Sequence, residues 1–513
     1  MSHRRPPRCR LAAHESPSPT APVVSAFAMY DSADETASEA STWGMESIDS
    51  DLKGLLGHNN VLLTAGIIVA DVVGAGILAM PVAVAKFGLI PGAIALVLLL
   101  LANVHISIVM WRVRMFCPTC KDSITYTGLV RDAFAVAPRW QRHLMVAMTG
   151  FCQKSFMLGM LVLYLMSAGK GFGMLFYQIQ VCLPNWVMYA GLLLLPFAAT
   201  ARHMGSWQSL VWVNIATLMG TVMIPLGYYT FVGTSEIKVP GSKVENYSEL
   251  TSSMILSGLS TFTFGMTSQF MLMEIIAEMK EPSKMPMAYA GVSAPFQLIM
   301  FTLAGIGGYM FMGDKVDGMM NENLPFGTAF QVAAGCMLTH MLISYLIKGV
   351  VFCKSVHRLI DKNYAHADDN RPRSWIGWTL VVATTLFASW LLANVVPFFG
   401  AAVDLLGASV TPLSCWIIPL VLYMRMCWDY PEYEIGRGSV FVRVLEWGII
   451  GIECLLALVL MVFGTRSSLI AISEAWSTYG APFDCHCEGL WKTCECSLQH
   501  AGMADFCAVP PVP

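Results

Sequence analysis

Three charged side chains stand inside apolar stretches of this 513-residue chain. Asp71 lies in IIVADVVGAGILAMP (67–81), Lys154 in GFCQKSFMLG (150–159) and Lys348 in LISYLIKGVVF (342–352). At the centre of a membrane helix such a charge costs roughly 2.5–3.5 kcal/mol, so each needs a partner or a water-filled cavity. Carboxylates and ammonium groups in these places can pair, carry a proton or bind a cation. Asp71, Lys154 and Lys348 are therefore candidates for ion coupling.

The stretch around Asp71 also carries Gly74, Gly76 and Pro81, which weaken or interrupt a helix. A second such stretch is LSTFTFGMTSQFMLMEIIAEMKEP, residues 259–282. Unpaired backbone at membrane depth is tolerated only where it lines a cavity or is buried in protein. A helix starting just after Gly76 would present N–H groups and its positive dipole end to an anion such as a carboxylate. Alternatively, the glycines only allow close packing of neighbouring helices.

The elements that must position these residues are membrane helices. The chain is 56% hydrophobic and 13% charged, whereas soluble domains have about 25% charged residues. Its apolar runs have about the 20 residues needed to cross a bilayer. The sequence therefore predicts an all-α, polytopic membrane protein with eleven transmembrane helices, at about 59–83, 88–111, 143–169, 184–200, 206–231, 252–278, 288–312, 328–352, 375–397, 400–424 and 440–464.

The two interrupted spans are the first and the sixth of this series. That spacing is expected if the chain consists of two five-helix halves, each of which begins with a broken helix. Interrupted segments at matching places in two repeats indicate the binding site of a transporter. The pairing of the breaks favours this interpretation over simple close packing.

The predicted domains are a disordered cytosolic tail over 1–57, a membrane domain over 58–465 and a Cys-rich tail over 466–513. An early arginine-rich run without an acid before Glu15 faintly resembles a transit peptide, a weaker alternative to a cytosolic tail. Lys and Arg mark the cytosolic loops, which places the N-terminus in the cytosol and the C-terminus on the lumenal or extracellular side. The glycosylation sequon at Asn246 falls on that same outer side.

Six cysteines are expected on the outer side, where an oxidising compartment favours disulfides. The C-x-C pairs of CHCEGLWKTCEC do not match the usual spacing of zinc ligands, so no metal site is predicted and metal binding is the lesser alternative. The disulfide candidates are Cys182, Cys485, Cys487, Cys494, Cys496 and Cys507.

Several motifs, in order along the chain, give a resemblance to a known family. The segment VVGAGILAMPVAVAKFGLIPG (72–92) contains the G-x-G-[IV]-L-x-x-P core that marks the first helix of that family. The segment FGMTSQFMLMEIIAEMKEPSKMP (264–286) aligns with the sixth helix of its members. Over about 58–465 the chain resembles the amino acid/auxin permease family of the amino acid-polyamine-organocation superfamily. The resemblance implies an eleven-helix secondary active transporter with the inverted five-plus-five repeat of the bacterial leucine transporter. It also implies amino acid substrates driven by protons or, in some branches, by sodium.

Carried over residue by residue, the resemblance implies a substrate site at the two breaks. The substrate carboxylate would meet the backbone at Gly74, Ala75, Gly76 and Ile77. The amine and side chain would face Phe262, Phe264, Gly265 and Ser268 on helix six, although both phenylalanines could equally be core residues. The Gly-His pair of plant members is replaced by Ser268-Gln269, which puts the transfer of any one subfamily's substrate in doubt.

The resemblance also implies a cation site between helices one and eight, where Asp71 and Lys348 fall. We expect them to pair, with the ammonium in the place of a sodium ion and Asp71 as the proton carrier. Alternatively, Lys348 snorkels to the cytosol and Asp71 caps the half-helix after the break. No partner is predicted for Lys154. Glu274 and Tyr345 are expected to be gate or structural residues.

The predicted function is proton-coupled amino acid transport by alternating access. The alternatives are a sodium-coupled carrier and an amino acid sensor that signals through its N-terminal tail. No H-E-x-x-H or G-x-S-x-G motif indicates an enzyme, and no cofactor is expected. The net charge of −3 and the lack of a long basic tract argue against a nucleic-acid partner. The expected partners are a small amino acid and the bilayer, with the oligomeric state open. The expected membrane is the plasma membrane or a vacuolar or lysosomal one.

Overall fold

The computed structural model describes residues 59–179, 181–202, 208–232, 242–314, 316, 319–360, 372–396, 399–479 and 482–483. These residues form helices, and their one β-type pairing is an isolated bridge between Asn59 and Met279. The first half contains α2 (Val61–Val72), η3 (Ala75–Ala79), α3 (Met80–Phe87), α4 (Leu89–Phe116), α5 (Tyr126–Ala133), α6 (Arg139–Leu175), α7 (Leu183–Thr200) and α8 (Gln208–Val232).

The second half begins with α10 (Ser252–Met266) and α11 (Gln269–Ala277) and continues to the end of the described chain. Its further elements are η5 (Pro282–Lys284), η6 (Met287–Ser293), α12 (Ala294–Phe301), η7 (Thr302–Gly307), α13 (Gly308–Met312), η8 (Met320–Asn323), α14 (Thr328–Ile360), α15 (Pro372–Val395), α16 (Phe399–Ala408), η10 (Pro412–Ile417), α17 (Ile418–Asp429), η11 (Pro431–Tyr433), α18 (Val440–Val459), η12 (Leu460–Gly464) and α19 (Thr465–Tyr479).

Within the described part of the chain, nine helices are long and apolar enough to cross a membrane, or ten if the bent pair of the first span counts as one. The all-helical, multi-pass prediction is therefore confirmed. The predicted sixth span, 252–278, consists of α10 and α11, of 15 and 9 residues, each too short to cross alone. The eleven-helix count and the inverted repeat stay predictions.

The last span is longer than predicted. We expect it to end at 464, but α18, η12 and α19 continue as one helical run to Tyr479. The added turns pack against α16, and Trp476 Nε1 donates to the Val395 carbonyl at 3.0 Å. Tertiary contacts thus extend the helix into the segment that the sequence assigns to the tail. The predicted tail 1–57 lies outside the described residues, and so does the C-terminal tail after Tyr479 apart from 482–483.

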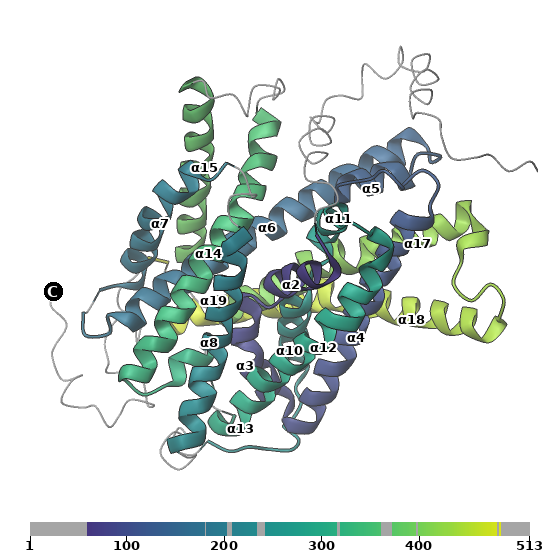
Figure 1. The fold of residues 1–513 in the computed structure, drawn as a ribbon. Helices are drawn as coiled ribbons and strands as arrows, with labels where there is room; N and C mark the ends of the chain where they lie inside the picture. Colours follow the sequence, from purple (N-terminus) through teal and green to yellow (C-terminus); the bar gives the residue numbers. More distant parts are fainter. Residues whose placement is uncertain are drawn as a thin grey trace, which may run out of the picture.

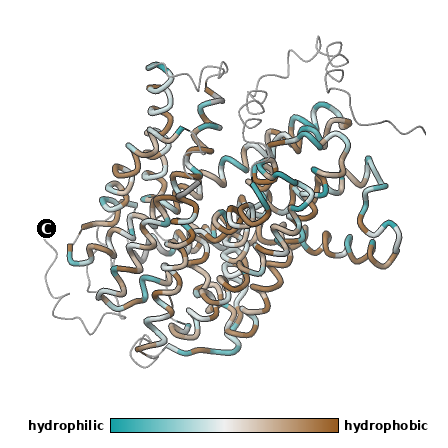
Figure 2. Tube along the Cα trace, in the orientation of Figure 1, coloured by the Kyte–Doolittle hydropathy of each residue, from teal (hydrophilic) through white to brown (hydrophobic). Residues whose placement is uncertain are grey.

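The first span is broken after Val72, where the chain bends by 52° before Ala75. In Figure 1, α2 and α3 lie in the middle of the helices, with α8, α10 and α4 around them. Figure 2 shows apolar residues along most of these helices. Because the broken backbone is buried among protein rather than lipid, its unpaired groups are tolerated there.

Close helix contacts in this core require glycine at certain positions. A Cβ on Gly407 of α16 would collide with the backbone carbonyl of Ser260 on α10. Gly400 lies seven residues earlier on the same helix, and apart from that helix's own backbone no described residue comes within 4 Å of its ideal Cβ position.

We predict that Gly407→Ala lowers the melting temperature of the purified protein, because overpacking against backbone typically costs about 1–3 kcal/mol. Gly400→Ala is the matched control and is expected to melt like the wild type. Equal melting of the two variants would contradict the close packing of α10 on α16.

Candidate functional site

The centre of the site is an ion pair between the end of α2 and the middle of α14. Lys348 Nζ lies 3.1 Å from Asp71 Oδ1 and donates hydrogen bonds to the Asp71 carbonyl at 3.1 Å and to Tyr164 Oη at 2.8 Å. The rings of Tyr164 and Phe270 each lie 5.3 Å from the ammonium. The lysine is therefore held by a carboxylate, a carbonyl, a hydroxyl and two aromatic faces.

Neither structural alternative matches the contacts of this pair in this conformation. Lys348 is 3% exposed, so its ammonium does not snorkel to a membrane surface. Gly74 stands at the N-cap of the half-helix, and no side chain caps it. Asp71 Oδ2 is buried and has no hydrogen-bond partner among the described residues. One carboxylate oxygen thus binds the lysine and the other is left without a partner.

The break itself brings four predicted residues together. Gly74 lies against Tyr164, whose Oη is 3.0 Å from an ideal Cβ at that glycine. Ala75 and Gly76 open the helical turn η3, where the first N–H groups of a helix have no partner within it. Ala75, Gly76 and Ile77 are buried. A Cβ on Gly76 would collide with Gly265 Cα, so Gly76 serves close packing as well as the break.

The predicted residues of helix six divide between the break and other contacts. Phe264 and Gly265 lie beside Gly76, with Phe264 Cδ1 3.4 Å from the ideal Cβ position of that glycine. The Phe262 ring stacks on Phe87 at 6.0 Å, near the end of α3. Ser268 Oγ forms a hydrogen bond with Tyr289 Oη at 2.9 Å. Phe264 and Gly265 are thus placed at the break, whereas Phe262 and Ser268 contact other parts of the core.

Gln269, which replaces the histidine of plant members, connects α11 to α4. Its Nε2 donates to Asn103 Oδ1 at 2.9 Å and to Ser107 Oγ at 3.0 Å, and its Oε1 accepts from the Ser268 N–H at 3.1 Å. Gln269 and its partners Asn103, Ser107 and Ser268 are all buried. The amide is therefore occupied by protein contacts that brace the second break.

Glu274 lies on α11 and Lys154 on α6. Glu274 Oε1 accepts from the Tyr126 N–H and from Gln153 Nε2, both at 3.4 Å, while the buried Oε2 has no partner in the described part of the chain. Glu274 thereby ties α11 to the start of α5. Lys154 forms no ion pair or hydrogen bond with any residue that the structure describes.

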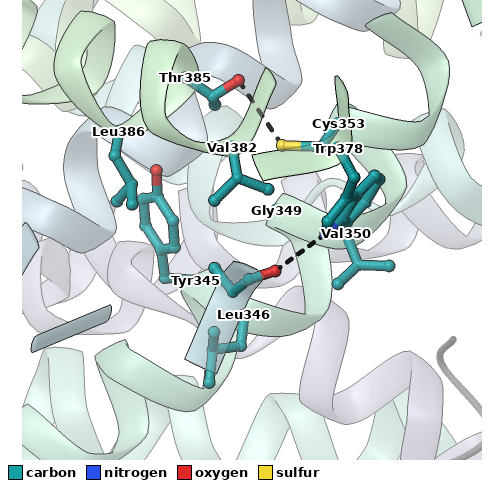
Figure 3. Close-up of a pocket in the computed structure, with 10 residues that line it drawn as sticks. Tyr345, Leu346, Gly349, Val350, Cys353, Trp378, Val382, Thr385 and Leu386 are labelled. Carbon is teal, nitrogen blue, oxygen red and sulfur yellow. Dashed lines mark hydrogen bonds between the residues drawn. The ribbon is translucent and has the colours of Figure 1, made fainter. Parts of the chain in front are cut away.

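Tyr345 lines a small pocket formed by α7, α14 and α15 (Figure 3). Its hydroxyl donates to Ser389 Oγ at 3.4 Å. The pocket is closed by Trp378, whose Nε1 donates to the Ala198 carbonyl at 3.2 Å, and by a contact of 3.5 Å between Cys353 and Thr385. None of its lining residues belongs to the broken helices, so Tyr345 faces this pocket and the gate role stays a prediction.

The contacts within two clusters of charged side chains were not predicted from the sequence. Lys86 Nζ lies 3.2 Å from Asp404 Oδ2, and Ser257 and Thr261 donate to the same carboxylate, which joins α3, α10 and α16. His105 on α4 contacts Glu453 at 2.9 Å and Glu446 at 3.2 Å on α18. A lysine just beyond the predicted first span, in AVAKFG, and an acid in AAVDLL were the available signals for the first cluster.

The outer-side modification candidates are only partly described. Asn246 is exposed, and its carbonyl accepts from the Ile90 N–H at 3.1 Å, which holds the sequon against the start of α4. Cys182 is disulfide-bonded. Cys485, Cys487, Cys494, Cys496 and Cys507 lie outside the described residues. Glycosylation and the disulfide connectivity remain predictions.

Comparison with known proteins identifies the family. Residues 58–465 match the family described as transmembrane amino acid transporter protein. The chain belongs to this family. This confirms the resemblance to the amino acid/auxin permeases that the motifs of the first and sixth helices indicate.

Individual members of the transmembrane amino acid transporter family are distant from this chain. Amino acid transporter ANT1 of Arabidopsis thaliana is 19% identical over 431 residues, which cover 81% of this chain and 93% of that protein. Amino acid transporter AVT3B of the same plant is 25% identical over 42% of this chain and 48% of its own length. The human vesicular inhibitory amino acid transporter is 25% identical over 36% of each chain. The chain thus spans about half of AVT3B and about a third of the vesicular protein.

We predict that Lys86→Met lowers the melting temperature, because it leaves the Asp404 carboxylate buried without its cation. Both side chains keep some exposure, 22% and 10%, so the cost should stay below the roughly 3–5 kcal/mol of a wholly buried pair. The double variant Lys86→Met, Asp404→Asn is expected to recover part of the loss.

Lys284→Met is the matched control, because Lys284 and its partner Glu281 are 49% and 58% exposed. Exposed pairs contribute about 0–1 kcal/mol, so this variant should melt like the wild type. The prediction fails if Lys86→Met and Lys284→Met change the melting temperature equally.

Proposed function

We propose that this protein is a secondary active transporter of amino acids, coupled to protons, that works by alternating access with the substrate held at the breaks of the first and sixth spans. The family supports the substrate class and the transport activity. The observation that carries the coupling mechanism is the buried Asp71–Lys348 pair next to the break, with one carboxylate oxygen unpartnered.

Asp71 is the proposed proton carrier. A buried ionised carboxylate needs its oxygens paired or hydrogen-bonded, because desolvation penalises the charge. Lys348 satisfies Oδ1, whereas Oδ2 has no donor among the described residues. A proton on Oδ2 neutralises the carboxylate and weakens its hold on Lys348. Protonation would then loosen α2 from α14 at the point where the first span is broken.

The ligands of Lys348 support protons over sodium as the coupling ion. The ammonium is surrounded by the Asp71 carboxylate, the Asp71 carbonyl and Tyr164 Oη, all within 3.1 Å. These oxygens are the kind of ligands that a hard metal cation takes. Because the lysine already occupies them, a sodium ion at this place would have to displace it.

Two contacts support a gating motion about the breaks. On one side of the break, Lys86 and Asp404 tie the half-helix α3 to α10 and α16. On the other side, Glu274 ties α11 to the start of α5. We propose that the first contact opens in the outward-facing state and the second in the inward-facing state. The substrate carboxylate would bind the free N–H groups at Ala75 and Gly76.

We predict that Asp71→Asn abolishes accumulation of amino acids driven by an inside-alkaline pH gradient in proteoliposomes, because the amide cannot carry the proton. The measurement is uptake of the twenty standard L-amino acids, with proton and sodium gradients imposed separately. Full gradient-driven accumulation by Asp71→Asn would exclude Asp71 as the carrier.

The single variant leaves a buried lysine without a counter-charge, which could unfold the protein. The double variant Asp71→Asn, Lys348→Gln removes both charges and keeps hydrogen-bonding groups. We expect it to fold and to exchange substrate across the membrane without accumulating it. Dependence of wild-type uptake on sodium instead of the pH gradient would favour the sodium-coupled alternative.

A sensor that binds amino acids and signals through its N-terminal segment is the second candidate function. A pure sensor would bind without net accumulation, so the same uptake experiment separates the two. The proposed location is the plasma membrane or a vacuolar or lysosomal membrane, with a cytosolic N-terminus. The vesicular protein among the relatives supports an internal membrane.

A further inference from the structure

A buried amide without partners lies in η8, the helical turn that precedes α14. The Asn321 side chain is 0% exposed, and neither its Oδ1 nor its Nδ2 has a hydrogen-bond partner among the described residues. Burial of an amide without hydrogen bonds costs free energy. A bound ligand that forms hydrogen bonds with both amide atoms would remove this cost. The neighbouring Asn323 differs, because its Nδ2 donates to the Met319 carbonyl at 3.0 Å.

The position of η8 connects this amide to the break of the first span. The turn packs against η3, α8 and α14, and Met320 and Asn321 are wholly buried there. Glu322 Oε1 accepts a hydrogen bond from Lys170 Nζ of α6 at 2.9 Å, which anchors the turn. The turn therefore covers the first residues of the half-helix after the break.

Three residues of α6 at intervals of three connect the break to η8. Tyr164 contacts Gly74 at the break, Lys170 binds Glu322 of η8, and Ser167 lies midway between them on the helix. Six residues of an α-helix rise about 9 Å, so the break and η8 lie beside neighbouring turns of α6. Ser167 is also buried, and its Oγ has no partner among the described residues.

We infer that Asn321, together with Ser167, contacts the amino acid bound at the break and selects substrates without net charge. The inference rests on the proposed function and adds a specificity-determining residue to it. An amide can accept from an ammonium with Oδ1 and donate to a carboxylate with Nδ2, so a zwitterion satisfies both atoms. Asn321 and Ser167 are uncharged, and Lys170, Glu322 and Lys348 are each in an ion pair. No charge in this group is left for a charged substrate side chain.

The test measures binding and stability in the purified full-length protein. Each of the twenty standard L-amino acids is titrated, and its apparent affinity is taken from the shift in melting temperature. Asn321→Leu is expected to melt at the wild-type temperature or higher without ligand, because it removes an unsatisfied buried amide. Its affinity for the amino acids that bind the wild type should fall at least about tenfold.

Asn323→Leu is the matched control on the same turn. It is expected to lower the melting temperature without ligand, because it breaks the hydrogen bond to Met319, and to leave the affinity within about threefold of the wild type. Asn321→Asp adds a negative charge and should raise the affinity for L-lysine relative to L-alanine.

The outcomes separate this inference from the proposed function. Unchanged affinity in Asn321→Leu, or a loss of stability equal to that of Asn323→Leu, would overturn the role of Asn321. Binding that depends on Asn321 without accumulation in proteoliposomes would support the inference and overturn active transport. A wild-type protein that none of the twenty amino acids stabilises would overturn both.

Discussion

The structure depends on one buried electrostatic contact, the pair of Asp71 and Lys348. In a low-dielectric interior neither charge is tolerable alone, and the end of α2 lies where α14 presents its lysine. The pair does more than neutralise charge, because Lys348 also binds the Asp71 carbonyl and Tyr164 of α6. Three helices are thereby fixed around the point at which the first span bends by 52°. The packing of Gly74 on Tyr164 and the start of η3 lie directly beside this arrangement.

Local sequence predicted much of the fold, since apolar length and helix-weakening residues are properties of short segments. The runs of apolar residues located most of the spans, and Gly74 and Gly76 located the break after Val72. The helix six motif likewise predicted an interruption within 259–282, and the structure has it at Thr267 and Ser268. The extent of α19 was missed, because it depends on contacts with α16.

The site was harder to predict, since its partners are far apart in the chain. Lys86 and Asp404 are separated by 318 residues, and no spacing rule relates them. The contact of Ser268 with Tyr289 and the place of Tyr345 in the pocket beside Trp378 were not predicted, and the roles expected of both residues stay predictions. Helical periodicity says which residues share a face. It does not say which neighbouring helix that face contacts, and this is set by packing of the whole bundle.

If the protein transports amino acids as proposed, the placement of Lys348 has a consequence for the electrical behaviour of the cycle. Its charge is covalently part of α14, so it stays in the protein through every cycle, whereas a bound metal cation would leave with the substrate. A zwitterionic amino acid has no net charge. Any membrane current that accompanies its movement would therefore be carried by the coupling ion alone, and the current would report the number of such ions moved with each substrate.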